Sequence, residues 1–211
     1  MIARWAALGA VLFLGGSLLR RPVEVRALRH ENVSVPDVSA DPAQGPATRP
    51  PFEVSARGRR FRIVPRCAWD ESGLVVGEDR YRFGASAALI PEDYAMAWGA
   101  AAAPPYRGTV HYRQSSRWYF FSYGDPNLDR AVIVSHSANT HVIPATSRIA
   151  EAASLVSEGD RVRLEGWLVD VDGIDDPGFR WRTSTSRTDE GPGSCETVYV
   201  ARLTINTRAY E

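Results

Sequence analysis

The hydrophobic period of the chain changes from helical to extended around Gly159, and this change constrains the fold more than any other feature. Before it, apolar residues recur at helical spacing: Ile149, Ala152, Ala153, Leu155 and Val156. Thr146 or Ser147 can supply the N-cap oxygen, and Gly159 stands where a helix commonly ends in left-handed backbone. From 161 to 171 apolar and polar residues alternate, so the sequence predicts a helix that leads into an amphipathic strand.

The rest of the domain also has the pattern of a mainly β protein. Shorter alternating runs lie at 60–64, 74–76, 81–83, 109–113, 117–123, 131–135, 180–184 and 197–205. Turn signals separate them at 71–73, 124–127, 172–173 and 191–193, and residues 91–99 are predicted as a short helix. Strands, one main helix and then further strands is the order of a small OB-like barrel, and a β-sandwich with one helix fits the same pattern.

The N-terminal segment is predicted as a membrane anchor. Residues 2–19 are apolar except for Arg4, and a helix of that length spans roughly 27 Å, enough for a thin bilayer core. A cleaved signal peptide and a buried helix are the alternatives, and Arg20 and Arg21 count against cleavage. The expected organisation is a single transmembrane helix at 1–21, a Pro-rich linker at 22–58 and a β-rich globular domain at 59–211.

The side of the membrane and the role of the linker stay open. The arginines that follow the apolar segment outnumber the positive charges before it, which by the positive-inside rule places the domain in the cytoplasm. The long Pro-rich tether and the usual orientation of bacterial N-terminal anchors favour the periplasmic side of the inner membrane, which is the expectation we adopt. The linker is either a passive spacer or a strap that lies along a partner protein.

The distribution of charge argues against nucleic-acid binding. All 25 basic residues are arginine and there are 25 acidic residues, so the net charge is zero. Residues 61–211 carry 16 arginines against 20 acidic residues. A nucleic-acid-binding domain needs a basic face to neutralise phosphates, so this mildly acidic domain is not expected to bind nucleic acid.

Several sequence pieces occur together in one known arrangement. They are LIPEDYAMAWG, QSSRWYFF, SHSANTHVIPA, GDRVRLEGWLVDV and WRTSTSRTDEGPGSCETVYV, between about Leu89 and Leu203. In this combination the chain resembles a family of bacterial membrane-anchored β-domain proteins. The resemblance implies one integral β domain behind an anchor and transfers no known activity.

Two histidines are the first candidates for chemistry. His136 and His141, with Asn139 between them, could join Asp189, Cys195 or Glu196 to give zinc four ligands. Their five-residue spacing in a predicted loop matches no zinc motif, and the other groups lie more than forty residues away. We therefore expect no metal, and imidazoles that bond to loop carbonyls instead.

Nucleophilic catalysis is the second candidate. Ser135 or Ser137 could act with His136, or Cys195 could act with His141 and Asp189. The chain has no Gly-x-Ser-x-Gly motif and no local signature around the cysteine.

Phosphodiester cleavage is the third candidate. Arg187, Asp189 and Glu196 are the residue types that hold a phosphate and a metal ion. A turn stapled by an Arg–Asp pair explains the same residues, and the acidic domain favours that explanation.

Aromatic residues suggest binding more strongly than the polar groups suggest catalysis. They are Trp98, Trp118, Tyr119, Phe120, Phe121, Trp167, Trp181 and Tyr199. Residues 118–121 are consecutive, so both faces of their strand are aromatic. One face should join the core, and the other is either covered by the N-terminal segment or exposed as a binding patch.

The two cysteines, Cys67 and Cys195, are candidates for a disulfide. A bridge requires an oxidising compartment and Cα atoms within about 7 Å, so it accompanies a periplasmic location. The alternative is two buried thiols that never meet.

These observations predict a membrane-tethered, non-catalytic binding domain without a cofactor, acting as an accessory or stabilising subunit of a larger bacterial membrane complex. The anchor, the linker and the aromatic face would contact the other subunits. The alternative is a membrane-anchored hydrolase or metal-dependent enzyme of OB-like fold. The candidate binding surface consists of Trp118, Phe120, His136, Asn139, His141, Trp167, Trp181, Arg187, Asp189 and Glu196.

Overall fold

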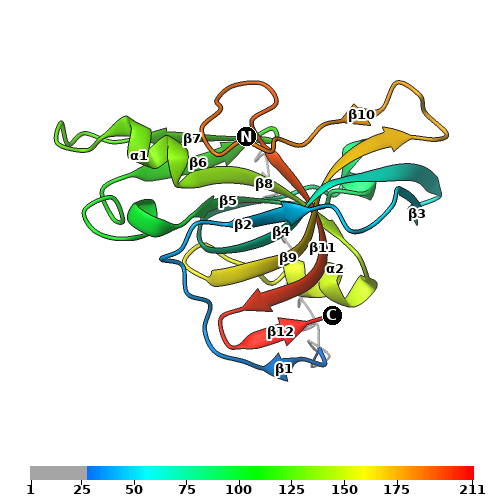
Figure 1. The fold of residues 1–211 in the computed structure, drawn as a ribbon, viewed down its shortest axis with the longest axis horizontal. Helices are drawn as coiled ribbons and strands as arrows, with labels where there is room; N and C mark the ends of the chain where they lie inside the picture. Colours follow the sequence, from blue (N-terminus) through cyan, green and yellow to red (C-terminus); the bar gives the residue numbers. More distant parts are fainter. Residues whose placement is uncertain (1–27) are drawn as a thin grey trace, which may run out of the picture.

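The chain is mainly β, as the sequence predicts, with two short α-helices and two 3-10 turns among the residues described by the computed structural model, 28–211 (Figure 1). The elements are β1 (Glu31–Asn32), β2 (Ala43–Pro46), β3 (Phe52–Ala56), β4 (Arg59–Arg80), η1 (Ser86–Ala88), β5 (Glu92–Ala97), η2 (Gly99–Ala102), β6 (His111–Ser115), β7 (Trp118–Ser122), α1 (Arg130–Ser135), β8 (Ser137–Pro144), α2 (Ser147–Ala153), β9 (Arg161–Gly173), β10 (Arg180–Trp181), β11 (Glu196–Ile205) and β12 (Arg208–Tyr210).

Most strands belong to one sheet in the order β1-β12-β11-β8-β5-β4-β9-β10, and β11 also pairs with β9. The contact between β8 and β11 is parallel, whereas β5 pairs antiparallel with both β4 and β8. A separate two-stranded sheet is formed by β6 and β7, which lie beside α1 at one end of the molecule (Figure 1).

The predicted turn at 71–73 is wrong, because β4 continues through it as one strand of 22 residues. Pairing with β9 runs from Phe61 to Leu74 and keeps the backbone extended through Gly73, with a register shift between Pro65 and Cys67. The predicted strand at 81–83 is also wrong, since β4 ends at Arg80.

The helix and strand around Gly159 are confirmed as α2 and β9. Thr146 is the N-cap, and its hydroxyl accepts a hydrogen bond from the amide of Ile149 at 3.2 Å. The helix ends at Ala153, earlier than expected, so Gly159 is not its terminal residue. Gly159 does adopt a left-handed φ of 92°, in the turn where its amide donates to the carbonyl of Val75.

Two local predictions are wrong in opposite directions. The expected helix at 91–99 contains strand β5, whose six residues are all buried, so no alternation marks it as extended. The expected strand at 131–135 is helix α1, which the side chain of Asp129 caps by accepting a hydrogen bond from the amide of Ala131 at 2.8 Å. In both cases tertiary contacts and capping outweigh local propensity.

The described part of the expected linker, from residue 28 to 58, belongs to the folded domain. Strands β2 and β3 pair antiparallel with β4, and β1 pairs with β12. Val38 is buried against Leu74 and Ala102. The Pro-rich stretch therefore lies along its own domain. Backbone pairing of its short strands holds it there, and its side chains bury little apolar surface.

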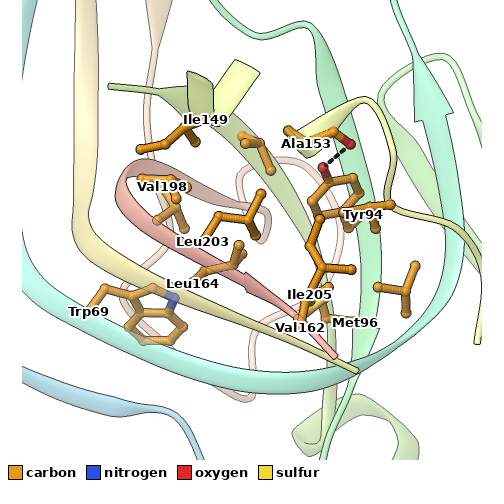
Figure 2. Packing of buried hydrophobic residues seen from close by; sticks show 14 of the residues in the cluster. Trp69, Tyr94, Met96, Ile149, Ala153, Val162, Leu164, Val198, Leu203 and Ile205 are labelled. Atoms are coloured by element: carbon orange, nitrogen blue, oxygen red, sulfur yellow. Dashed lines mark hydrogen bonds between the residues drawn. The ribbon is translucent and has the colours of Figure 1, made fainter. Parts of the chain in front are cut away.

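The main core lies between α2 and the strands β4, β5, β9 and β11 (Figure 2). Tyr94 is fully buried there, and its hydroxyl donates to the carbonyl of Ala153 at 2.8 Å. This bond ties β5 to the end of α2. Gly166 lets β9 and β11 approach closely, since a Cβ atom at this position would lie 2.0 Å from the carbonyl oxygen of Tyr199.

The predicted transmembrane helix at 1–21 lies outside the described residues. From residue 28 onward, every helix is too short to cross a bilayer.

Candidate functional site

The hairpin of β6 and β7 is fastened to β5 and β8 through the arginine in its turn. The two turn residues, Ser116 and Arg117, both have positive φ (54° and 73°), as a two-residue turn of type I′ requires. The Arg117 guanidinium donates to Asp93 Oδ1 at 2.8 Å and to Ser86 Oγ and the carbonyl of Ile90 at 3.0 and 2.9 Å. It also lies 3.4 Å from the centre of the Tyr81 ring. These contacts hold the left-handed conformation of a residue that is not glycine.

Asp93 joins Arg117 to a buried histidine. His141 Nδ1 lies 2.8 Å from the same carboxylate oxygen, and both side chains are buried. The imidazole meets the Trp181 ring edge-on, with 4.9 Å between ring centres. Because Nδ1 faces a carboxylate, the Nδ1–H tautomer is favoured and Nε2 points away from Asp93. The result is an oriented imidazole beside a fixed guanidinium.

Asn139 connects the same hairpin to the loop before β11. Its amide nitrogen donates to the carbonyl of Arg117 at 2.9 Å and to Cys195 Sγ at 3.6 Å, and its oxygen accepts from Gln114 at 2.6 Å. Burial raises the pKa of the Cys195 thiol to about 11, and the hydrogen bond from Asn139 only partly opposes this. Cys195 is therefore protonated at neutral pH and a poor nucleophile.

Two adjoining cavities open around these groups, with volumes of about 400 and 350 Å³, and they share Trp118 and Cys195. The larger lies between β7 and the loop before β11, and is lined by Phe120, Arg130 and Glu190 among others. The smaller is lined by Arg117, Trp118, His141, Arg180, Trp181, Arg182, Gly193 and Cys195. Both volumes are in the range of small-ligand pockets.

A second polar cluster lies beside the core and consists of the buried Glu71, Thr140 and Glu196 with the partly buried Arg187. Arg187 donates to Glu196 and lies 4.5 Å from the centre of the Trp69 ring. Trp69 donates its indole N–H to Glu71 at 3.2 Å. Burial raises the pKa of Glu71 to about 7, and burial together with Glu71 raises that of Glu196 to about 8, with Arg187 opposing both shifts. Burial thus favours the protonated form of both carboxyl groups, and the Arg187 cation paired with Glu196 favours the ionised form.

The fold gathers half of the candidate surface and separates the rest. The two cavities are lined by Trp118, Phe120, His141, Trp181 and Asp189. Asn139 contacts the lining residues Arg117 and Cys195, and Arg187 and Glu196 belong to the second polar cluster. Trp167 lies elsewhere, in a group of rings with Phe52 and Tyr199 that the Arg49 guanidinium covers. His136 sits at the end of α1.

The catalytic groupings named from the sequence are not assembled. Ser135 Oγ is 2.8 Å from His136 Nδ1, but that nitrogen is also 3.0 Å from the carbonyl of Val132 and so carries the proton. A protonated Nδ1 cannot accept the hydroxyl proton of Ser135. The hydroxyl of Ser137 donates to the carbonyl of Ile133 at 2.7 Å and does not contact His136.

The cysteine grouping is likewise rearranged. Asp189 accepts a hydrogen bond from the hydroxyl of Ser184 at 2.8 Å. The carboxylate beside His141 is that of Asp93 and not, as the sequence suggested, that of Asp189. Within residues 28–211, no three His, Cys, Asp or Glu side chains are grouped as metal ligands.

The disulfide considered for Cys67 and Cys195 is not formed in this structure, where both are free thiols, as in the alternative of two thiols that never meet. Strand β9 separates the two elements, because Leu168 pairs with Cys67 on one side and with Val198 on the other. Cys195 lies just before β11, on the far side of β9 from Cys67.

Sequence reasoning missed Asp93, Arg117 and Arg180. Asp93 was hidden in a segment predicted as helix, and Arg117 was counted only as part of an aromatic strand. One signal was available for Asp93: it is an acidic residue directly before the apolar run from 94 to 98, where a charge that becomes buried needs a partner.

Comparison with known proteins adds nothing to this geometry: no family model, curated protein or solved structure matches the chain. The function must therefore be inferred from the site itself.

Proposed function

We propose that the central strands form a small OB-like barrel. Each of β4, β5, β8, β9 and β11 pairs with two others of the five, and the contact between β8 and β11 is parallel. Helix α2 lies in the chain between β8 and β9. OB-fold proteins bind ligands on strands two and three and on the adjoining loops, and the corresponding strands here are β5 and β8, where Asp93, Asn139 and His141 project toward the hairpin.

We propose that the chain is a membrane-tethered binding domain, a non-catalytic accessory or stabilising subunit of a larger bacterial membrane complex. One observation carries this proposal. Trp118 and Phe120 are 39% and 48% exposed on β7, a strand held in place through Arg117 and Asn139. Aromatic side chains on a rigid support bind partners with little loss of conformational entropy, and such residues dominate interface energies.

The two faces of β7 differ in their surroundings, and only the face of Trp118 and Phe120 is exposed. Tyr119 and Phe121 turn toward Tyr112 of β6 and the small cluster around Ile133. Within the described part of the chain, one face of β7 therefore packs against the domain and the other is exposed to solvent. An apolar patch next to two cavities is typical of an interaction surface.

An anchored hydrolase of OB-like fold is the second candidate, and the Asp93–His141 pair favours it. An imidazole that a carboxylate orients through Nδ1 can act as a general base through Nε2. Cys195 lines the same cavity as His141 and is the candidate nucleophile, but the raised pKa of that thiol weakens the argument. Elemental analysis of the purified chain bears on the metal-dependent form of this alternative, since a stoichiometric transition metal would support it.

The experiment for the binding role compares complexes extracted from native membranes in mild detergent. The full chain should migrate at a native mass well above that of a monomer. The double variant Trp118→Ala/Phe120→Ala should lose the larger species, because two aromatic anchors each contribute about 2 kcal/mol or more to a typical interface. Leu155→Ala is the matched control, since Leu155 is a 45% exposed apolar residue outside the cavities. A monomeric wild type, or a double variant that stays in the complex, would contradict the proposal.

A further inference from the structure

The smaller cavity is locally basic in a domain that is acidic overall. Residues 28–211 contain 21 arginines against 24 acidic residues, yet three arginines and a histidine line this one cavity. Asp93 compensates the charge of Arg117 at 2.8 Å, and Asp172 compensates that of Arg182 at 2.6 Å. Arg180 is exposed and has no side-chain hydrogen bond or ion pair to another residue between 28 and 211. One positive charge at the cavity is therefore available to a ligand.

Two indole rings supply the apolar part of the same cavity. Trp181 is held between His141, edge-on at 4.9 Å, and Phe179, stacked at 6.3 Å. Trp118 of β7 also lines this cavity and is 39% exposed. Both rings thus present apolar surface to the cavity, and the contacts of Trp181 fix the orientation of its ring before a flat molecule binds.

His141 adds a polar atom within the cavity. Its Nδ1 is occupied by Asp93, and the ring lines the cavity with Nε2 as the remaining polar position. A neutral imidazole can accept one hydrogen bond there, and a charged one can donate. The cavity therefore offers a cation, a hydrogen-bonding nitrogen and two aromatic rings within about 350 Å³.

We propose that this cavity binds a small aromatic anion, a flat ring system that carries one carboxylate or phosphate group. The anionic group contacts Arg180 at the rim, and the ring lies against Trp118 and Trp181. A volume of about 350 Å³ holds one such molecule. A polyanion is disfavoured, because a nucleic-acid chain needs an extended basic track and this domain carries more acids than arginines.

This ligand site goes beyond the proposed role as a complex subunit and does not depend on it. Both sites use Trp118, which lines both cavities, but the partner surface adds Phe120 at the larger cavity, whereas the anion site adds Arg180, Trp181 and His141 at the smaller one. A purified chain without any partner can bind the anion, so the two proposals fail separately.

The test titrates the purified full chain, in a nonionic detergent, with two anions and their neutral counterparts. The pairs are adenosine monophosphate with adenosine and 1-naphthoate with 1-naphthamide. Indole N–H signals in NMR spectra report directly on the cavity, because Trp118 and Trp181 line it. We expect at least one anion to shift two indole signals with a Kd of about 1 mM or lower, and its neutral counterpart to bind about tenfold more weakly or less. The tighter of the two anions distinguishes phosphate from carboxylate.

Variants localise the effect. Arg180→Gln should weaken binding of the anion about tenfold while leaving the neutral compound unchanged, since it removes a charged donor and no ring. Arg113→Gln is the matched control, because Arg113 is exposed on β6 and does not line the cavity. Trp118→Leu should weaken both members of a pair.

Three outcomes would overturn the proposal. The first is no indole shift with either anion up to about 10 mM. The second is equal affinity for charged and neutral partners, or an unchanged affinity in Arg180→Gln. The third is a single-stranded oligonucleotide that binds about a hundredfold more tightly than the mononucleotide, which would make the ligand a polymer.

Discussion

Replacing Glu71 with glutamine tests whether the buried carboxylate on β4 carries a proton in the folded domain. The side chain is fully buried, and its Oε1 has no hydrogen-bond partner among the described residues. Its Oε2 accepts from the Trp69 indole at 3.2 Å, a bond that a glutamine oxygen can also accept. Glutamine has nearly the same shape as a protonated glutamate, so the substitution removes the ionisation and little else.

The expected magnitude follows from the shift in pKa. Burial raises the pKa of Glu71 from 4.5 to about 7. One pKa unit corresponds to about 1.4 kcal/mol, so the shift corresponds to about 3 kcal/mol. Because the folded-state pKa is raised, the stabilisation is present below pH 4.5 and is lost as the pH rises through 7. The wild type should lose about 3 kcal/mol of unfolding free energy from this group between those limits.

The variant should keep that stability. We expect Glu71→Gln and wild type to be similar at a pH of about 4 and the variant to be more stable by about 3 kcal/mol at a pH of about 8.5. Urea unfolding of the full chain at a series of pH values measures the difference. Glu151→Gln is the control, because Glu151 is exposed on α2 and should show no such divergence.

A constant difference between wild type and Glu71→Gln across this pH range would refute the reasoning. It would mean that Glu71 is ionised in the folded domain despite its burial, with Arg187 compensating both carboxylates. Glu196 titrates in the same direction, so the wild-type profile alone is not diagnostic, and only the comparison with the variant isolates Glu71.

Three further predictions concern the site and the strands that support it. Cys195 should react with iodoacetamide about a hundredfold more slowly in the folded chain than in urea, because burial raises its pKa from 9.0 to about 11; a rate close to that of the unfolded chain would contradict the burial. Arg117→Gln should destabilise the domain by about 3 kcal/mol or more, since it leaves the buried Asp93 without its cation, and adding Asp93→Asn should recover much of the loss in thermal unfolding. Gly166→Ala should cost about 3 kcal/mol or more because its Cβ would meet a backbone carbonyl, whereas Gly159→Ala should cost about 1 kcal/mol, from its left-handed φ alone; equal losses in urea unfolding would show that the strand approach is not tight.

The site was predictable only in part. Trp118, His141 and Trp181 were singled out from the sequence, and the fold brings all three to one cavity. Their mutual arrangement depends on Asp93, which lies on a strand that composition favours as a helix. The sequence spacing of residues 93, 117, 141 and 180 does not predict that they come together. Their proximity depends on which strands become neighbours in the sheet.

The sequence by itself determined the features that depend on local pattern. The helix at 147–153 and the strand at 161–173 are specified by their hydrophobic periods and by the N-cap at Thr146, which act within a few residues. The β class follows from many such runs. Only the tertiary structure decided that 92–97 is a strand, that 28–58 adds strands to the sheet, and that Cys67 and Cys195 stay apart. Each of these features depends on hydrogen bonds between segments that are distant in the sequence. Those bonds stabilise the chain only once the sheet is assembled, so no local sequence pattern predicts them.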